Sequence, residues 1–440
     1  KWDWSVQYPV IRISFGGGVV NDHSQLENRC LALLRSNEKR LDIVCDDKGS
    51  ISISNYFESL IQTAVAKTGQ RVVILVDEYD KPILDNLTRP EQAKALRDGL
   101  RNLYSVIKDN DAYVKFAMLT GVSKFSKVSI FSGLNNLNDI TLDAPYSAIC
   151  GYTDEDIDTV FAPELDGLDR EEIRRWYNGY NWTGESVYNP FDVLLLFRER
   201  TFNAYWFETG TPTFLIDLLS ERHTFTPELN HFVASDALLS AFDVEQMSTE
   251  AIMFQTGYLT IDKTRRTAAM TQYQLRYPNL EVKSSLNEGL LYTLTAKSSN
   301  YVTHTAKLYE LLLENNFEGM KKLFTAFFAS IPHDWYRNNP IAQYEGYYAS
   351  VFYSYFAALG LDIILEDTSN YGRIDMTVRF NDQVYLFEFK VVELEPEGNA
   401  LQQLQDKNYA AKYQALNQPI HLIGVEFSKE QRSVVAFAVL

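Results

Sequence analysis

The sequence predicts a multidomain α/β protein, and three stretches support this prediction. An apolar run at 72–76 ends in two acidic residues, Asp77-Glu78. Residues 203–319 show mostly helical patterns, and residues 372–390 form two strand-like segments joined by a short turn. At about 150 residues per domain, a chain of 440 residues predicts two to three domains. We expect them at residues 1–150, 151–330 and 331–440.

The composition predicts a soluble protein of the cytoplasm. Hydrophobic residues make up 46% of the chain and aromatic residues 13%, which is enough for sizeable cores. No apolar run reaches the ~18–20 residues that span a bilayer, so we expect no membrane segment. Cys30, Cys45 and Cys150 show neither close pairing nor metal-site spacing, which favours a reducing compartment. Six scattered histidines argue against a histidine-based zinc site.

The charge balance argues against tight nonspecific binding to DNA. The chain carries a formal net charge of −17, and nucleic-acid binders usually display a basic patch. The last 110 residues contain eight Lys and Arg against fourteen Asp and Glu. Carboxylates gathered around a metal ion would account for part of this excess.

The first 120 residues alternate strand and helix patterns, which predicts a parallel sheet. The apolar runs at 8–15, 72–76 and 113–120 are expected strands, and 24–44, 55–68 and 91–108 are expected helices. Gly16-Gly17-Gly18 follows the first strand, where glycines can cradle a phosphate, but an ordinary loop is the simpler interpretation. No GxxxxGK[ST] motif occurs anywhere in the chain.

Asp77 and Glu78 have the form of a Walker B strand end. A strand buried in a parallel sheet is apolar on both faces, and ligands bind beyond its carboxyl end. In that role Asp77 holds magnesium through water and Glu78 orients the attacking water. The alternative is a buried strand followed by an acidic loop.

The middle of the chain is expected to be helical with one basic hairpin. Residues 154–161 and 169–177 are expected helices, and Asn189-Pro190 opens another. Residues 255–262 and 270–277 are expected strands joined by a turn at 263–266. A winged helix would place Lys263, Arg265 and Arg266 on phosphates. The alternative, a packing module with a solvated hairpin tip, suits the acidic surroundings better.

Near the C-terminus, a hairpin places charged residues within a mostly apolar sheet. We expect a helix at 344–359, a short strand at 363–366, and strands on either side of a turn at 381–383. By the period of two, Glu388 and Lys390 share one face of the second strand with Val384 and Leu386. A buried charge is costly unless it is paired or bound to a metal, and this cost indicates a site.

The residue types at this hairpin suit phosphodiester hydrolysis. Mg²⁺ or Mn²⁺ prefers oxygen ligands, which Asp375 and Glu388 supply, with the Phe389 carbonyl as an extra candidate. A bound metal activates water and neutralises developing charge. Lys390 is placed to orient that water or to stabilise the transition state. The alternative is a structural salt bridge from Lys390 to Asp375 or Glu388.

Three long stretches resemble a known family: VVILVDEYDKPIL, LTGVSKFSKVSIFSGLNNLNDITLD and ICGYTDEDI. They are similar to the AAA-ATPase-like proteins of bacteria and archaea that carry a C-terminal PD-(D/E)XK nuclease domain. The resemblance covers essentially the whole chain. It implies a P-loop core over 1–150, a helical, winged-helix-like middle over 151–330, and a restriction-endonuclease-like domain of mixed α/β structure over 331–440.

In that family a Walker A loop lies upstream of the first strand expected here. This chain begins at Lys1, just before that strand, so we interpret it as a fragment that lacks the loop. The loop supplies most phosphate contacts, and ATP binding is therefore expected only in the intact protein.

The resemblance also extends the candidate site beyond the hairpin. It implies that Asp375 and the Glu388-Phe389-Lys390 run form the PD-(D/E)XK pattern, with Ile374 in place of the usual proline. It adds Glu345 from the preceding helix. It also adds Gln403 and Tyr409 from an expected helix at 400–413, with Lys407 nearby.

We therefore expect a magnesium- or manganese-dependent nuclease, acting on nucleic acid and in particular DNA, coupled to an ATPase in the intact protein. A second hypothesis is a nucleotide-regulated module that binds DNA or a partner through a catalytically silent nuclease-like domain. A third is an ATPase regulator with a degenerate tail. The sequence leaves the oligomeric state open.

Overall fold

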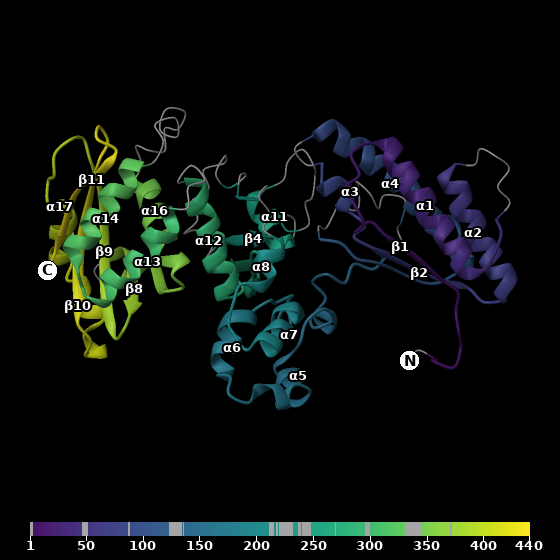
Figure 1. The fold of residues 1–440 in the computed structure, drawn as a ribbon, viewed down its shortest axis with the longest axis horizontal. Helices are drawn as coiled ribbons and strands as arrows, with labels where there is room; N and C mark the ends of the chain where they lie inside the picture. The colour runs from purple at the N-terminus through teal and green to yellow at the C-terminus, as the bar shows by residue number, and fades with distance from the viewer. Residues whose placement is uncertain are drawn as a thin grey trace. The chain divides into compact units, whose positions relative to one another are not determined.

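The computed structural model describes residues 3–45, 52–86, 89–122, 134, 136–210, 215–216, 219, 232–235, 239, 248–268, 270–294, 300–330, 345–369 and 372–440. The chain divides into two compact units. The first contains Lys1–Leu142, Ala234–Gly257 and Thr264–Tyr273, and the second contains Asp143–Val233, Tyr258–Lys263 and Gln274–Leu440. Each unit is described by itself (Figure 1).

The first unit contains the expected parallel sheet. Strands β1 (Val10–Ser14), β2 (Val72–Asp77) and β3 (Val114–Leu119) lie in the order β1-β2-β3, and both neighbouring pairs are parallel. The helices are α1 (His23–Leu41), α2 (Ile53–Thr68), α3 (Lys81–Leu84) and α4 (Pro90–Asp109). The alternation of strand and helix predicted from the sequence is confirmed here.

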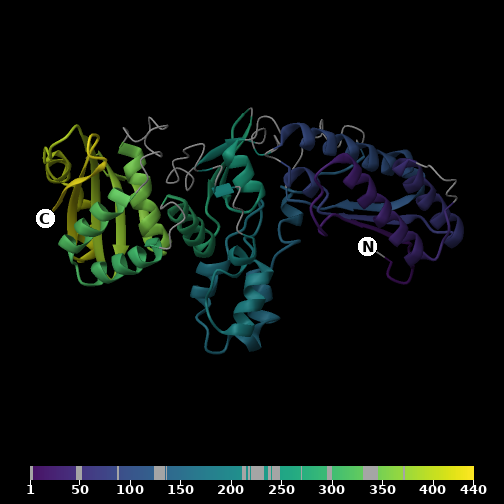
Figure 2. The ribbon, with the colours of Figure 1, turned by 45° about the horizontal axis from the view of Figure 1, so that its top comes forward.

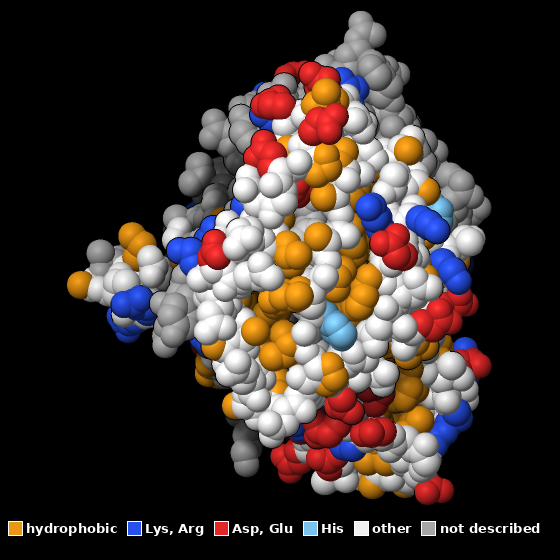
Figure 3. Space-filling view, turned by 90° about the vertical axis from the view of Figure 1, so that its left-hand side faces the viewer, with side chains coloured by type: hydrophobic (Ala, Val, Ile, Leu, Met, Phe, Trp, Pro, Cys, Tyr) orange, Lys and Arg blue, Asp and Glu red, His pale blue; other side chains and the backbone are white. Residues whose placement is uncertain are grey.

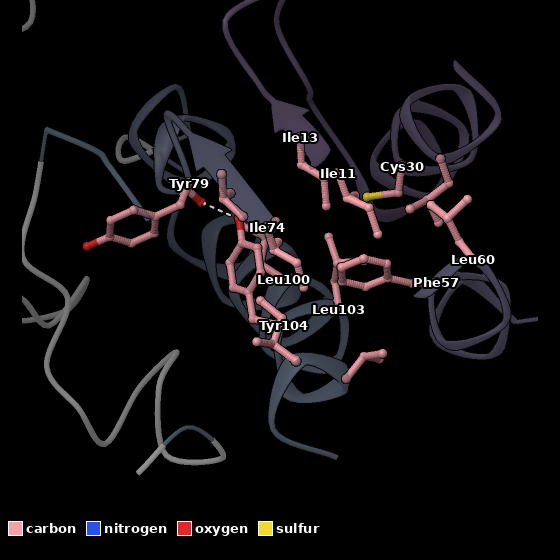
Figure 4. Close-up of a cluster of buried hydrophobic side chains, with 14 of the residues drawn as sticks. Ile11, Ile13, Cys30, Phe57, Leu60, Ile74, Tyr79, Leu100, Leu103 and Tyr104 are labelled. Atoms are coloured by element: carbon pink, nitrogen blue, oxygen red, sulfur yellow. Dashed lines mark hydrogen bonds between the residues drawn. The ribbon is translucent and has the colours of Figure 1, made fainter. Parts of the chain in front are cut away.

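Helices α1, α2 and α4 bury the apolar side chains of this sheet (Figure 4). Ile11, Ile13 and Ile74 from the strands face Phe57 and Leu100 from the helices. These side chains are almost fully buried. The core holds β2 firmly, and β2 therefore fixes the position of the acidic residues at its end.

The middle of the chain is largely helical, as expected. Its helices are α5 (Asp154–Thr159), α6 (Arg170–Tyr177), α7 (Pro190–Glu199), α8 (Tyr205–Gly210), α11 (Thr249–Gln255) and α12 (Leu280–Leu294). Asp169 caps α6 by accepting the N–H groups of Glu171 and Glu172, and Asn189 caps α7 with Pro190 following it.

The expected basic turn of the middle hairpin is wrong. Strand β5 runs from Thr260 to Arg266 and β6 from Thr271 to Arg276, in a sheet of order β4-β6-β5 with β4 (Val233–Ser235). The residues expected in the turn lie within β5, and Gln255 ends α11 instead of opening a strand. The connection closes instead where the Thr267 N–H donates to the Met270 carbonyl at 2.9 Å.

The C-terminal part is built on the expected mixed sheet, here of five strands in the order β11-β10-β9-β8-β7. The strands are β7 (Asp362–Ser369), β8 (Gly372–Phe380), β9 (Gln383–Val392), β10 (Ile420–Ser428) and β11 (Ser433–Val439). The β9–β10 pair is parallel and the others are antiparallel. Asn381 and Asp382 both have positive φ, as a two-residue hairpin turn requires.

Helices cover both faces of this sheet (Figures 1 and 2). Phe387 and Phe389 of β9 pack with helices α13 (Asn300–Leu313), α14 (Phe317–Ser330) and α16 (Glu345–Ala358). Val384 and Leu386 pack on the other face, against α17 (Asn399–Asp406). The predicted alternation of β9 is thus confirmed. The expected domain boundary near residue 331 lies outside the described residues.

The expected helix at 400–413 is wrong in its length. Helix α17 ends at Asp406, Asn408 has a left-handed backbone, and Tyr409 begins a short 3-10 turn (Tyr409–Lys412). The helix stops because the following segment bends back to the sheet, where Tyr413 donates to the buried Asp367 carboxylate.

Two buried carboxyl groups hold the start of α8 in the middle region. Asp192 of α7 accepts the Trp206 N–H at 2.8 Å, and Glu281 of α12 accepts it at 2.9 Å. Burial, and then the neighbouring Asp192, raise the pKa of Glu281 to about 9, while burial raises the pKa of Asp192 to about 6. No donor among the described residues reaches Asp192 Oδ2 or Glu281 Oε2. A side-chain hydrogen bond with Asp192 also contributes to the raised pKa of Glu281, so a protonated Glu281 can donate to the Asp192 carboxylate.

Glu281→Gln is expected to make the stability of this region less dependent on pH. The folded chain keeps a proton on Glu281 that the unfolded chain releases near its ordinary pKa of 4.5. The contribution of this group is therefore complete below about pH 4.5 and is lost as the pH rises towards 9, by at most about 1.4 kcal/mol per pH unit for one proton. Glutamine supplies the N–H donor permanently. Hydrogen exchange of residues 205–210 at pH 5, 6.5 and 8 measures the difference.

The matched control is Glu199→Gln, which changes an exposed carboxylate on the same helix as Asp192. Its exchange should follow the wild type at every pH. Parallel pH profiles for wild type and Glu281→Gln would contradict a proton donated by Glu281 to Asp192.

Candidate functional site

The site lies where the ladder between β8 and β9 ends. The two strands pair from Phe380↔Gln383 to Met376↔Phe387. Asp375 and Glu388 are the next positions on each strand, just past the last pair. Predicted site residues from two strands are thus brought together by the register of the hairpin.

Asp375 bridges the two strands at this point. Its Oδ2 accepts the backbone N–H of Phe389 at 2.8 Å. Burial raises the pKa of the Asp375 carboxyl, while the Phe389 N–H and the positive charges of Lys390 and Arg373 act in the opposite direction. The bond fixes the orientation of the carboxylate towards β9. The expected role of the Phe389 carbonyl as a ligand stays a prediction.

Glu388 is deeply buried, with 1% of its surface exposed. Its Oε1 accepts hydrogen bonds from Gln403 Nε2 on α17 and from Lys390 Nζ, the latter at 3.3 Å. The sequence-predicted residues Glu388, Lys390 and Gln403 therefore meet around one carboxylate. The salt bridge that the alternative interpretation expected is present between Glu388 and Lys390.

Helix α17 reaches Glu388 because two residues of β10 hold it close to the sheet. Gly424 pairs with Glu388, and a Cβ at Gly424 would clash with the backbone nitrogen of Leu401. Glu426 is buried and accepts the N–H of Glu397 at 2.7 Å and of Ala400 at 3.3 Å. A carboxylate at this position satisfies N–H groups at the start of the helix and interacts favourably with its dipole.

Sequence reasoning missed Gly424 and Glu426. The signal was present, because IHLIGVEFS is an apolar strand with one glutamate, and the same cost of burial that singled out Glu388 applies to Glu426. It also missed Asp367 of β7, a buried carboxylate that accepts from Thr377 Oγ1 at 3.0 Å and from Lys412 and Tyr413.

Two further predicted residues, Tyr409 and Glu345, differ in what the structure describes of them. Tyr409 packs over the edge of β8, where a Cβ at Gly372 would lie 2.7 Å from its hydroxyl oxygen. Glu345 is the first residue of α16, and its side chain is outside the described part of the structure. Helix α16 covers the face opposite to that of Glu388. The role of Glu345 stays a prediction.

The donor set fits a hard divalent cation held by few protein ligands. Across the described ranges, no three His, Cys, Asp or Glu side chains are close enough together to hold a metal ion. Two neighbouring carboxylates do occur, at Asp375 and Glu388. Mg²⁺ commonly uses one or two carboxylates and keeps several waters, so this pair meets its needs.

The second candidate site lies at the carboxyl end of the parallel sheet. Asp77 ends β2, and its Oδ1 accepts the Thr120 hydroxyl at 2.8 Å. Glu78 has a φ of 52°, and its carboxylate lies against Gly16, where a Cβ would be 3.0 Å from Oε1. Asp77, Glu78 and the glycine run after β1 are therefore gathered at one edge, as the topology predicts.

A buried aspartate and a tyrosine hold the turn after Glu78. Asp80 is fully buried and accepts the Val122 N–H at 3.2 Å. The Tyr104 hydroxyl donates to the Tyr79 carbonyl at 2.9 Å (Figure 4). These contacts connect the end of β2 to α4 and to the segment after β3. The sequence predictions did not include Asp80 or Tyr104.

Comparisons with known proteins match the chain at both ends. Residues 1–131 match the AAA-ATPase-like family model, described as "Predicted AAA-ATPase", and residues 343–437 match the PD-(D/E)XK nuclease superfamily. The chain is 66% identical over 439 residues to "Uncharacterized protein in vnfD 5'region" of Azotobacter chroococcum mcd 1. The alignment covers 100% of this chain and 84% of that protein. No solved structure matches the chain.

Gly424→Ala is expected to displace α17 from the sheet. The added methyl group has no space beside Leu401, and overpacking of this kind typically costs about 1–3 kcal/mol. The displacement should break the Gln403–Glu388 contact and release the Glu397 and Ala400 N–H groups from Glu426. Urea unfolding gives the loss of stability, and hydrogen exchange of residues 397–406 reports the helix.

Gln403→Ala is the matched comparison, because it removes the same contact without moving the helix. It should leave exchange at residues 397–400 close to that of the wild type. If Gly424→Ala also exchanges like the wild type, the close approach of helix and sheet is not what places Gln403.

Proposed function

Because the chain belongs to the AAA-ATPase-like proteins that carry a C-terminal PD-(D/E)XK nuclease domain, we propose that it hydrolyses phosphodiester bonds with a divalent metal ion. The family resemblance predicted from the sequence is confirmed at both ends of the chain. The proposal assigns 331–440 to the nuclease-like domain, 1–150 to the ATPase-like core and 151–330 to the region between them.

One observation carries this proposal: a buried glutamate, an aspartate, a lysine and a glutamine converge at the end of the β8–β9 ladder. Asp375 and Glu388 would hold Mg²⁺ or Mn²⁺. When bound, the metal supplies Lewis-acid stabilisation and lowers the pKa of a coordinated water. Lys390 offers a positive charge beside that water, and Gln403 holds the Glu388 carboxylate in place. Glu345 remains the proposed additional acid.

The proposed substrate is nucleic acid, and DNA in particular. The distribution of charged side chains on the surface of the C-terminal part limits how nucleic acid can bind there. On the face drawn in Figure 3, Lys and Arg side chains are scattered, and Asp and Glu gather at the upper and lower ends of the view. Binding by general attraction to phosphates is weak on such a surface. We therefore propose that the nucleic acid is recognised at the Asp375 and Glu388 site itself.

We also propose that Asp77 and Glu78 act on magnesium-bound ATP in a protein that supplies a Walker A loop. Their position at the carboxyl edge of the parallel sheet supports this role. Glu78→Gln in such a protein should slow ATP turnover strongly, because the carboxylate that orients water is lost. Phosphate release measures this turnover, with Glu91→Gln, a change in α4, as the control. Equal turnover in Glu78→Gln and wild type would contradict the assignment.

We place the protein in the cytoplasm. The three cysteines are free thiols, two of them buried, which suits a reducing compartment. Among the described helices, none is long and apolar enough to cross a membrane.

A second candidate function is a nucleotide-regulated module that binds DNA or a partner without cutting. The Lys390–Glu388 ion pair favours it, because an ammonium group can compensate the buried carboxylate in place of a metal. The two functions differ in whether a divalent cation binds at Asp375.

The nuclease proposal predicts that cleavage depends on both carboxylates. With Mg²⁺ or Mn²⁺, the wild type should cut single- or double-stranded DNA. Asp375→Asn and Glu388→Ala should lower the rate more than about 100-fold, because even outer-shell changes at metal sites typically cost 10- to 100-fold. Gel assays over a range of enzyme concentrations measure the rate.

Asp362→Asn is the matched control, because it changes an exposed carboxylate of the same sheet and should leave cleavage unchanged. Equal activity in all variants, or no activity in the wild type, would defeat the nuclease proposal. Calorimetric titration with Mn²⁺ then separates the candidates. Binding that Asp375→Asn abolishes supports a metal site, and no binding supports the silent module.

A further inference from the structure

The pairing of β7 with β8 is interrupted beside the candidate site. The strands pair at Leu365↔Met376 and again at Asp367↔Ile374. Between these pairs, Glu366 stands opposite Asp375 without pairing, and its φ is 46°. The register does not shift across this gap, so Glu366 stays directly opposite Asp375 of the candidate site.

Glu366 directs its carboxylate to Arg373. Its Oε1 lies 3.1 Å from Arg373 Nη1, and the two side chains are 56% and 59% exposed. A left-handed backbone costs a residue with a Cβ about 1–2 kcal/mol. An exposed ion pair contributes only about 0–1 kcal/mol. The ion pair alone therefore does not offset the cost of the left-handed backbone at Glu366, and the buried contacts of the adjacent Asp367 help to hold the segment in place.

The guanidinium of Arg373 is close enough to the site to act on it. Arg373 precedes Asp375 by two residues, or about 6–7 Å along a strand. Its ion-pair partner Glu366 stands directly opposite Asp375 in the register of β7 and β8. The preceding Gly372 lies against the Tyr409 hydroxyl, which fixes the backbone there. An arginine held in this way presents a planar fork of N–H donors at the margin of the site.

We propose that Arg373 binds a phosphate group of the nucleic acid strand held at Asp375 and Glu388, and that Glu366 orients its guanidinium for this contact. The inference rests on the proposed function and adds a residue that the sequence predictions did not include. Guanidinium and phosphate groups form paired, charge-assisted hydrogen bonds, which are stronger than neutral ones. On a surface poor in basic residues, one such contact should have a large effect on affinity.

The chain offers a matched control for this arginine. Arg379 lies on the same strand, six residues or about 20 Å further along, and pairs with Asp362 of β7 at 3.6 Å. Its side chain is 46% exposed. Arg373→Ala and Arg379→Ala thus remove the same charge from similar ion pairs, one near the site and one remote from it.

Fluorescence anisotropy with a labelled single-stranded or duplex DNA, with Ca²⁺ in place of Mg²⁺ or Mn²⁺ so that a divalent ion is present but cleavage is slow, tests the inference. Arg373→Ala should weaken binding about 5- to 20-fold for any base sequence and reduce the slope of log affinity against log salt by about one. Arg379→Ala should stay within twofold of the wild type. Arg373→Lys should keep the salt slope and lose part of the affinity, because the paired donors are lost.

The outcomes separate this inference from the nuclease proposal. If the wild type does not cut DNA but Arg373→Ala alone weakens binding, the inference stands and the nuclease proposal fails. If the wild type cuts DNA but both alanine variants bind alike, the inference is overturned. Undetectable binding of DNA by the wild type also overturns it. Circular dichroism and thermal unfolding of each variant exclude a folding defect.

Discussion

The C-terminal part of the structure depends on the cost of burying Glu388. A carboxyl group in the middle strand of a sheet loses its water and needs donors from the protein. Lys390 supplies one from the same strand, but Gln403 must come from a helix that lies over the sheet. That helix comes close enough only because position 424 has no side chain. The glycine at position 424 of β10 is therefore explained by the needs of Glu388 on β9.

The same constraint recurs at other buried acids. Glu426 accepts N–H groups at the start of α17, Asp367 accepts side-chain donors, and Asp192 shares the backbone donor of Trp206 with Glu281. Each acid joins elements that are distant in sequence. Part of the excess of acidic residues thus lies inside the fold, where it fixes the positions of helices. The net charge of the chain overstates how acidic its surface is.

The sequence predicted the strands of the parallel sheet and of the C-terminal sheet well, because a continuous apolar run suits a strand that is buried on both faces. The period of two placed Glu388 on the face of Val384 and Leu386, and the structure confirms that division. The prediction failed where tertiary contacts override local pattern. The pattern after Asp406 continues as a helix, but the Tyr413 contact with Asp367 turns the chain. Glu426 stands in an apolar strand, as Glu388 does, but the sequence does not show that its partners are backbone N–H groups at the start of α17.

The two candidate functions differ in which cation compensates Glu388. An ammonium group at 3.3 Å and a divalent metal are both solutions to the same desolvation cost. Lys390 supplies one donor to Glu388 from the same strand and Gln403 supplies another from α17, and neither contact involves Asp375. Yet Asp375 is half-buried beside Glu388, and its carboxylate is fixed by the Phe389 N–H towards β9. A second carboxylate beside Glu388 raises the electrostatic cost, unless a further positive charge is shared between the two. The geometry of Asp375 therefore favours a divalent cation over a purely structural ion pair.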